Sequence, residues 1–296
     1  MLMRSIPACL LGRRLLLYLV LVGLLAGRAV AQPISIVAAE NFYGDVAEQL
    51  AGSNATVSSV LSKPDQDPHL FEASPSVARL LAGASIVVYN GADYDPWMTK
   101  LLSASRPPNR TVIVVADLVH RKPGDNPHLW YDPSTMPAYA KALSAALSQR
   151  DPAHQAEYDQ RLRAFLDALQ PLQAKIAELR GKFSGIQVTA TEPVFGYMAN
   201  ALGFKMRNER FQLAVMNDTE PRASDVAAIE NDLRKREVRV LFYNSQATDT
   251  AAERLVRIAR ESKVPVVGVT ETEPNGTTYQ AWMMQQLDAV ARALGP

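Results

Sequence analysis

The chain has 296 residues, a length that suits one large domain or two of medium size. Of these residues 48% are hydrophobic and 21% charged, which is an ordinary composition for a globular protein. An N-terminal segment, residues 1–31, holds four Arg and no acid, so the remainder has 27 basic and 30 acidic residues and a net charge of −3, which argues against a nucleic-acid partner. The only cysteine, Cys9, is in the same segment, so any metal bound by the remainder must be held by nitrogen and oxygen.

Residues 1–31 have the features of a secretory signal peptide. Three arginines precede the apolar run 15–26, and Ala29-Val30-Ala31 supplies a small-residue cleavage signal. The alternative, a membrane anchor, needs roughly 20 apolar residues, more than this run offers, and no other stretch is long enough. Cys9 lies before the apolar run, which is not the place for a lipid-attachment site. We therefore expect a periplasmic protein.

Strands and helices alternate in the first half of the chain. Strands are expected at residues 34–39, 56–61, 85–89 and 111–116, and helices at 43–52, 75–82, 93–104 and 132–149. Ser74-Pro75 is an N-cap followed by a proline at the first helical position, and Gly83 ends that helix. The alternation predicts a parallel α/β sheet, and we assign residues 32–150 to an N-terminal α/β domain.

A long helix is expected next. Asp151-Pro152 opens it, little glycine follows, and apolar residues recur at helical spacing to about Lys182. At 1.5 Å per residue it would span roughly 45 Å, longer than one domain requires, although Pro171 can bend it. We interpret residues 151–183 as an interdomain helix. A long helix packed within one domain is the alternative.

The alternation resumes after this helix. Strands are expected at residues 185–190, 238–244 and 264–269, an extended segment at 204–215, and helices ending at Leu202 and covering 224–237, 249–262 and 279–294. Residues 184–296 are therefore assigned to a C-terminal α/β domain. The predicted fold class is α/β, with two parallel-sheet α/β domains joined by one long connecting helix.

Two loops share a Pro-His-Leu-aromatic frame, Asp67-Pro68-His69-Leu70-Phe71 and Asn126-Pro127-His128-Leu129-Trp130. Proline restricts both itself and the preceding residue, so these are stiff loops that can present an imidazole to a metal. Each histidine could instead be a half-buried loop residue. His120 and His154 lack the frame, and we expect both to be exposed.

Four possible metal ligands follow predicted strands. His69 and His128 follow the second and fourth strands of the first half, and Glu192 and Glu271 follow the first and last strands of the second. Ligands bind outside the carboxyl ends of open parallel sheets, so the four groups would face one another if the two halves pack end to end. Two imidazoles and two carboxylates suit Mn²⁺, Fe²⁺ or Zn²⁺.

Each acid has an alternative role. Glu192 could interact with the dipole at the start of the following helix, and Glu271 could be a surface loop acid. Glu273 competes with Glu271 for the position of fourth ligand, whereas Asp249 is better explained as a helix N-cap. Trp282, Met283 and Met284 on the last predicted helix are expected in the core.

The whole of residues 32–296 resembles the periplasmic solute-binding proteins of zinc- and manganese-type ABC transporters, a group built around a rigid interdomain helix. The resemblance is carried by the two Pro-His-Leu frames, by Thr191-Glu192-Pro193-Val194-Phe195-Gly196-Tyr197, by Glu220-Pro221 and by the ending from Tyr279 through Met283-Met284. Two positions differ from the zinc-type pattern: Glu192 stands where zinc members commonly have histidine, and Glu271 where Asp is usual. The acid- and histidine-rich loop of some zinc members is absent.

This resemblance implies a monomeric extracytoplasmic receptor that captures one Mn²⁺ or Zn²⁺, with Fe²⁺ as a further option, between two domains and passes it to a membrane ABC permease. It also implies a small domain shift about a stiff helix and no catalysis. Manganese is slightly preferred over zinc because Glu192 and Glu271 can each bind through one or both oxygens, so coordination can exceed the four ligands that zinc usually takes. A metal-dependent hydrolase is one alternative, but the sequence contains no HExxH or G-x-S-x-G motif to support it. A binding protein for an organic solute or metal chelate is the other, suggested by Trp130, Tyr131 and Arg222.

Overall fold

The computed structural model describes residues 33–63, 71–104, 107, 109–246 and 250–295. The predicted signal peptide, His69 and Asp249 lie outside these ranges. The helices and strands described below all belong to one compact unit, Ile34–Pro296. No helix within the described ranges is both long enough and apolar enough to cross a membrane.

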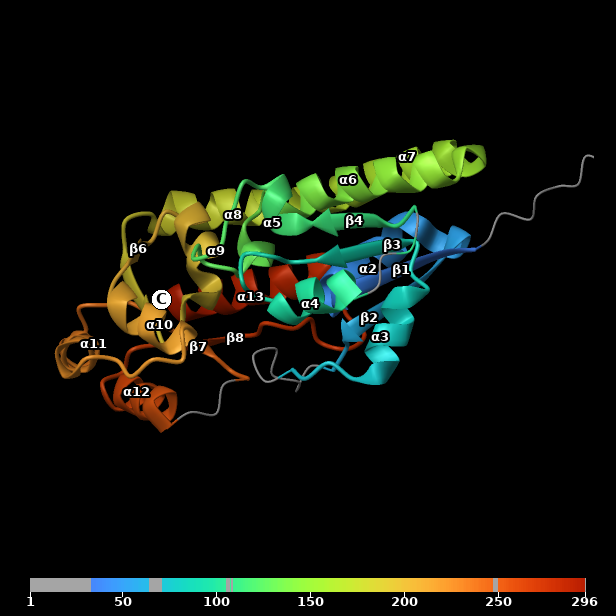
Figure 1. The fold of residues 1–296 in the computed structure, drawn as a ribbon. Coiled ribbons are helices and arrows are strands. Elements are labelled where there is room, and N and C mark those ends of the chain that lie inside the picture. Colours follow the sequence, from blue (N-terminus) through green and yellow to red (C-terminus); the bar gives the residue numbers. More distant parts are fainter. Residues whose placement is uncertain (1–32, 64–70, 105–106, 108, 247–249, 296) are drawn as a thin grey trace, which may run out of the picture. The chain divides into compact units, whose positions relative to one another are not determined.

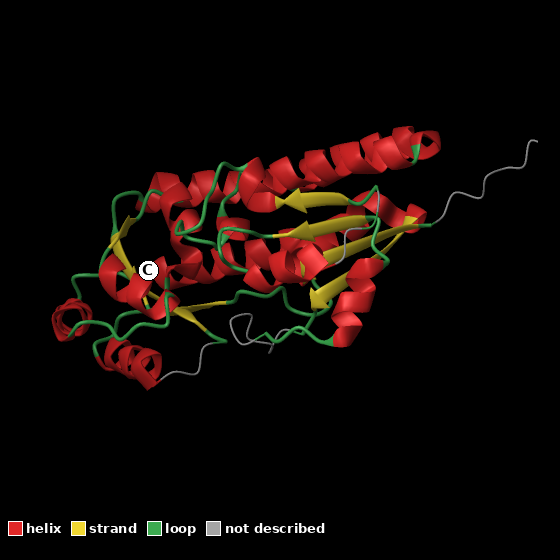
Figure 2. Ribbon diagram, in the orientation of Figure 1, coloured by secondary structure: helices red, strands yellow, loops and turns green. Residues whose placement is uncertain are grey.

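The first sheet has four parallel strands in the order β2-β1-β3-β4 (Figure 2). They are β1 (Ile34–Glu40), β2 (Ala55–Leu61), β3 (Ile86–Tyr89) and β4 (Thr111–Val114). Around them lie the helices α2 (Asn41–Ala51), α3 (Pro75–Ala82), α4 (Pro96–Ala104), α5 (Val115–Leu118) and α6 (Thr135–Arg150). The central strand β1 is buried along nearly its whole length, as its continuous apolar sequence predicts for a strand covered on both faces.

The second sheet repeats this arrangement, with four parallel strands in the order β6-β5-β7-β8. They are β5 (Gln187–Ala190), β6 (Lys205–Met206), β7 (Leu241–Asn244) and β8 (Val266–Val269). The helices of this half are α9 (Gly196–Ala201), α10 (Glu209–Met216), α11 (Ala223–Lys235), α12 (Thr250–Glu261) and α13 (Tyr279–Leu294). The predicted fold class, two α/β halves with parallel sheets, is confirmed.

The prediction of an extended segment at residues 204–215 is wrong. Only the two residues of β6 are extended, and α10 begins at Glu209. Phe211 and Val215 are four residues apart, so in a helix they share one face, which packs against Ile229 and Leu233 of α11. Burial of that face decides the conformation. The predicted strand 111–116 is likewise shorter, because the chain turns into α5 after Val114.

The connection between the two sheets consists of two helices where one was expected. A 3₁₀ turn, η3 (Pro152–His154), leads into α7 (Gln155–Ala168), and α8 (Gln170–Phe183) follows after Leu169 (Figure 1). Pro171, in the first turn of α8, has no N–H to donate to the preceding turn, which explains why the helix divides there. The domain boundaries at 150/151 and 183/184 remain predictions.

The two halves share one continuous apolar core. Aromatic rings link them: between ring centres, Tyr131 lies 5.3 Å from Phe195 and 5.8 Å from Trp282, and Phe42 lies 6.0 Å from Trp282. Trp282 and Met283 of α13 are fully buried, as expected, and Met284 is partly buried against the same core. This shared core holds the ends of the two sheets in place beside each other.

Candidate metal centre

His128 is presented by a loop that buried side chains hold in place. It lies between Pro127 and the 3₁₀ turn η2 (Leu129–Tyr131), all three residues of which are buried. The Trp130 ring packs 4.9 Å from Tyr94 and 5.3 Å from the imidazole of His128. The hydroxyl of Tyr279 on α13 donates to the Trp130 carbonyl at 2.7 Å. The Leu-aromatic pair of the sequence frame therefore anchors the loop, and the proline stiffens it.

Asn126 determines which imidazole nitrogen of His128 can bind a metal. Its side-chain Nδ2 donates to the Pro193 carbonyl at 2.8 Å, so its Oδ1 is the atom facing His128 Nδ1 at 2.6 Å. Because Oδ1 can only accept, Nδ1 carries a proton, and in the neutral imidazole Nε2 then presents a lone pair. Among the described residues, the buried Nε2 has no hydrogen-bond partner. Metal-bound histidines commonly show this arrangement, in which one nitrogen donates to a neighbour and the other binds the ion.

Glu192 lies between β5 and the 3₁₀ turn η4 (Pro193–Phe195). It is the N-cap residue of that turn, but its side chain makes no capping hydrogen bond. The carboxylate instead accepts a hydrogen bond at Oε2 from Asn244 Nδ2 at 3.0 Å, and the residue is 7% exposed. These contacts favour the ligand role of Glu192 over the alternative that it serves the helix dipole.

Glu271 follows β8 and is 1% exposed. Its Oε2 accepts from the Tyr94 hydroxyl at 3.0 Å, and its Oε1 accepts from Asn244 Nδ2 at 2.5 Å. Its backbone N–H donates to Gln246 Oε1 at 2.5 Å. Burial is the main cause that raises the pKa of the Tyr94 hydroxyl well above its usual value, and the nearby Glu271 carboxylate is the second. This hydroxyl therefore keeps its proton and remains a donor.

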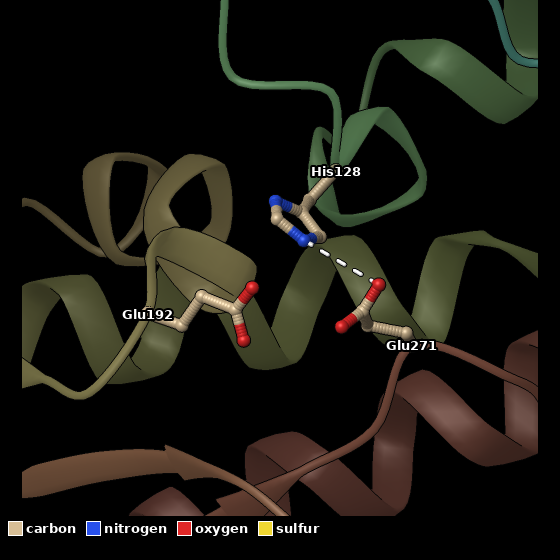
Figure 3. A group of neighbouring side chains, drawn as sticks. All are labelled: His128, Glu192 and Glu271. Carbon is tan, nitrogen blue, oxygen red and sulfur yellow. Dashed lines mark ion pairs between the residues drawn. The ribbon is translucent and has the colours of Figure 1, made fainter. Parts of the chain in front are cut away.

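The structure brings three of the four predicted ligands together. One ligand atom each from His128, Glu192 and Glu271 lies within 4.8 Å of the others, and all three residues are buried (Figure 3). His128 Nε2 lies 3.7 Å from Glu271 Oε2. Buried charges in proteins are normally paired or bound to metals. An imidazole nitrogen and two carboxylates at this spacing can hold a divalent transition metal.

The remaining predicted site residues are distributed as follows. His69, the fourth predicted ligand, lies outside the described residues, whereas His120 and His154 are exposed, as expected. Glu273 is buried but points elsewhere: its main chain exchanges two hydrogen bonds with the Asn41 side chain, and its carboxyl lies near Thr277. Of the two competing acids, only Glu271 belongs to the cluster.

Sequence reasoning missed three residues that surround the ligands, namely Tyr94, Asn126 and Asn244. Asn244 ends β7, and Tyr94 lies shortly after β3, so the rule that ligands gather at the carboxyl ends of parallel strands could have pointed to both. Asn126 was part of the quoted frame, but only the three-dimensional contacts reveal its action on His128.

A second pair of acids lies behind the ligand loops. Glu40 ends β1 and is 0% exposed, and Asp95 is 2% exposed. Asp95 accepts hydrogen bonds from the backbone N–H groups of Asn90 and Gly91, at 2.6 and 2.8 Å. The Asn90 side chain in turn donates to the Pro127 carbonyl at 2.9 Å. Asp95 therefore supports, through Asn90, the loop that carries His128.

Comparisons with known proteins all point to one family of metal-binding transport proteins. The sequence profile of the family described as zinc-uptake complex component A, periplasmic, matches residues 36–293. The manganese ABC transporter substrate-binding lipoprotein PsaA of Streptococcus pneumoniae is 24% identical over 311 residues, covering 96% of this chain and 98% of PsaA. The iron-binding protein YfeA of Yersinia pestis is 23% identical over 279 residues, covering 90% of this chain and 88% of YfeA.

Solved structures show the same fold. The periplasmic zinc-binding protein TroA of Treponema pallidum superimposes with a TM-score of 0.74 and 21% sequence identity, and the match covers 90% of this chain and 100% of TroA.

Proposed function

Because the chain belongs to the family of periplasmic zinc-uptake complex component A proteins, we propose that it captures one divalent transition-metal ion and delivers it to a membrane ABC permease. The ion is Mn²⁺ or Zn²⁺, with Fe²⁺ as a third option. Relatives named for manganese, iron and zinc support this range of cargo. The ion is the transported substrate.

The observation that carries this proposal is the buried cluster of His128, Glu192 and Glu271. His128 belongs to the half that contains the first sheet, and both glutamates belong to the half that contains the second. A bound ion would therefore connect the two halves. Two carboxylates neutralise the charge of a divalent ion, which makes a buried position tolerable. We assign the fourth ligand to His69, on the strength of its repeated Pro-His-Leu frame.

The same proposal covers location and organisation. Residues 1–31 direct secretion, and the protein acts in the periplasm as a monomer without catalysing a reaction. The net charge of −3 beyond this segment supports a protein that does not bind nucleic acid. The parts are an N-terminal domain 32–150, a connecting segment 151–183 and a C-terminal domain 184–296. Two similar sheets with α7 and α8 between them support this division.

Equilibrium dialysis of the secreted protein against Zn²⁺ or Mn²⁺, followed by elemental analysis, tests the proposal. We expect one ion per chain, and its loss in His128→Ala. His154→Ala is the matched control, since His154 is exposed and pairs with Asp151. Absence of bound metal in the unaltered protein, or equal binding in His128→Ala, would contradict the proposal. Metal-dependent turnover of ester or phosphoester substrates would favour a hydrolase.

A further inference from the structure

Asn244 lies where the two ligand carboxylates meet. It is the last residue of β7 and is 4% exposed. Its Oδ1 accepts a hydrogen bond from the Gln246 N–H at 3.0 Å, so its NH₂ group must be the part that faces the acids. That NH₂ donates to Glu192 Oε2 at 3.0 Å and to Glu271 Oε1 at 2.5 Å. One amide therefore holds one oxygen of each carboxylate.

This arrangement gives the two carboxylate oxygens of Glu271 different neighbours. Oε1 is turned to Asn244, whereas Oε2, which also accepts from the Tyr94 hydroxyl at 3.0 Å, is the oxygen 3.7 Å from His128 Nε2. An ion that binds His128 Nε2 therefore meets Glu271 through Oε2. A carboxylate whose other oxygen is engaged by an amide donor cannot rotate freely to offer both oxygens to one ion. The same restraint acts on Glu192 through its Oε2.

We propose that Asn244 is a positioning residue that limits Glu192 and Glu271 to one metal bond each and thereby favours Zn²⁺ over Mn²⁺. The inference rests on the proposed function. Two such carboxylates and two histidines supply four donors, the number zinc usually takes. Mn²⁺ prefers more oxygen ligands in an octahedral arrangement, which carboxylates binding through both oxygens would supply. Without the Asn244 amide, the two glutamates could bind manganese through both oxygens, and the amide opposes this mode of binding.

The test uses Asn244→Leu, which has a similar volume and no donor, and Asn244→Ala. Affinities for Zn²⁺ and Mn²⁺ are measured by competition with a chromophoric chelator. We expect the Zn/Mn affinity ratio to fall about tenfold in both variants, which corresponds to about 1.4 kcal/mol. The visible absorption of the Co²⁺-loaded protein should weaken as the coordination number rises. Gln212→Leu is the matched control, because it removes a buried side-chain amide that donates to the Arg207 carbonyl, away from the acids.

The outcomes separate this inference from the proposed function. If the unaltered protein binds neither metal, both fail. If it binds one ion and the variants keep its Zn/Mn ratio and Co²⁺ spectrum, the inference is overturned and the receptor function stands. A change of the same size in Gln212→Leu would also overturn it, since the effect would then be general. Loss of cooperative thermal unfolding in both Asn244 variants would show that the amide serves folding, and would overturn the inference as well.

Discussion

Replacing Glu40 with glutamine should make the metal-free protein more stable near neutral pH. Burial, and next the Asp95 carboxylate, raise the pKa of the Glu40 carboxyl well above its usual value. Burial also raises the pKa of Asp95, to about 6, while the hydrogen bond from Glu40 lowers it. Glu40 is therefore the partner that keeps its proton, beside the Asp95 carboxylate. Glutamine has the same shape and can donate an N–H in its place.

The size of the effect follows from proton linkage. An unfolded glutamate loses its proton near pH 4.3, whereas folded Glu40 retains it to higher pH. Above that value the folded state binds a proton that the unfolded state lacks, so the free energy of unfolding falls as pH rises, by at most about 1.4 kcal/mol per pH unit. Between pH 4.5 and 6.5 this amounts to at most about 3 kcal/mol. Glu40→Gln should gain up to that amount at pH 6.5 and nothing below pH 4.

Urea unfolding followed by circular dichroism from pH 4 to pH 7.5, with chelator present, measures the difference. Glu72→Gln is the control, since it removes an exposed acid from the same half of the molecule. If the unfolding free energies of Glu40→Gln and the unaltered protein run parallel across this range, Glu40 is ionised in the folded state and the reasoning fails. A loss of stability at pH 6.5 would also contradict it.

Three further predictions concern metal binding. Affinity should fall as pH decreases from 7 to 5, because protons compete with the ion for imidazole and carboxylate ligands; a flat profile in chelator competition would exclude histidine ligands. Glu192→His should raise the Zn/Mn affinity ratio in paired titrations, since a nitrogen then replaces an acid, and no rise would mean that Glu192 does not set selectivity. Asn126→Ala should weaken Zn²⁺ binding roughly 10- to 100-fold, because His128 Nδ1 loses its acceptor; Asn54→Ala, which removes an amide bonded to Glu157, should not change it.

The fold followed from the sequence wherever local pattern and tertiary packing agree. The continuous apolar run in β1 and the Ser74-Pro75 helix start both form as predicted, and the Ser74 hydroxyl accepts from the Val77 N–H at 3.4 Å. The pattern failed at α10, where Phe211 and Val215 fit a strand or a helix equally well over so short a distance. Contact with α11, the next helix in the chain, selects the helix.

The approach of Glu192 to Glu271 could be predicted because each closely follows a strand, and the topology of parallel sheets brings such residues to one edge. His128 is farther from its strand, since α5 lies between β4 and its loop. The residues that orient these ligands could not be predicted. Asn126, Tyr94 and Asn244 act through hydrogen bonds to partners as far as 177 positions away in the chain. Amides and hydroxyls are common at loop and strand ends for many reasons, so their presence alone indicates nothing about a ligand.

The choice between Glu271 and Glu273 shows what the structure adds to a sequence pattern. Both follow β8 in an irregular segment, where side-chain direction has no fixed period. Tyr131 holds this segment by donating to the Thr270 carbonyl at 2.9 Å, and Asn41 holds it by accepting from the Glu273 N–H at 3.1 Å. Glu271 is thereby directed at His128, whereas the Glu273 carboxyl lies near Thr277. Burial, and next the Asp45 carboxylate, raise the pKa of Glu273 to about 9, so it is neutral at pH 7. A protonated carboxyl is a poor ligand for a cation, which argues against Glu273 as the metal ligand of this segment.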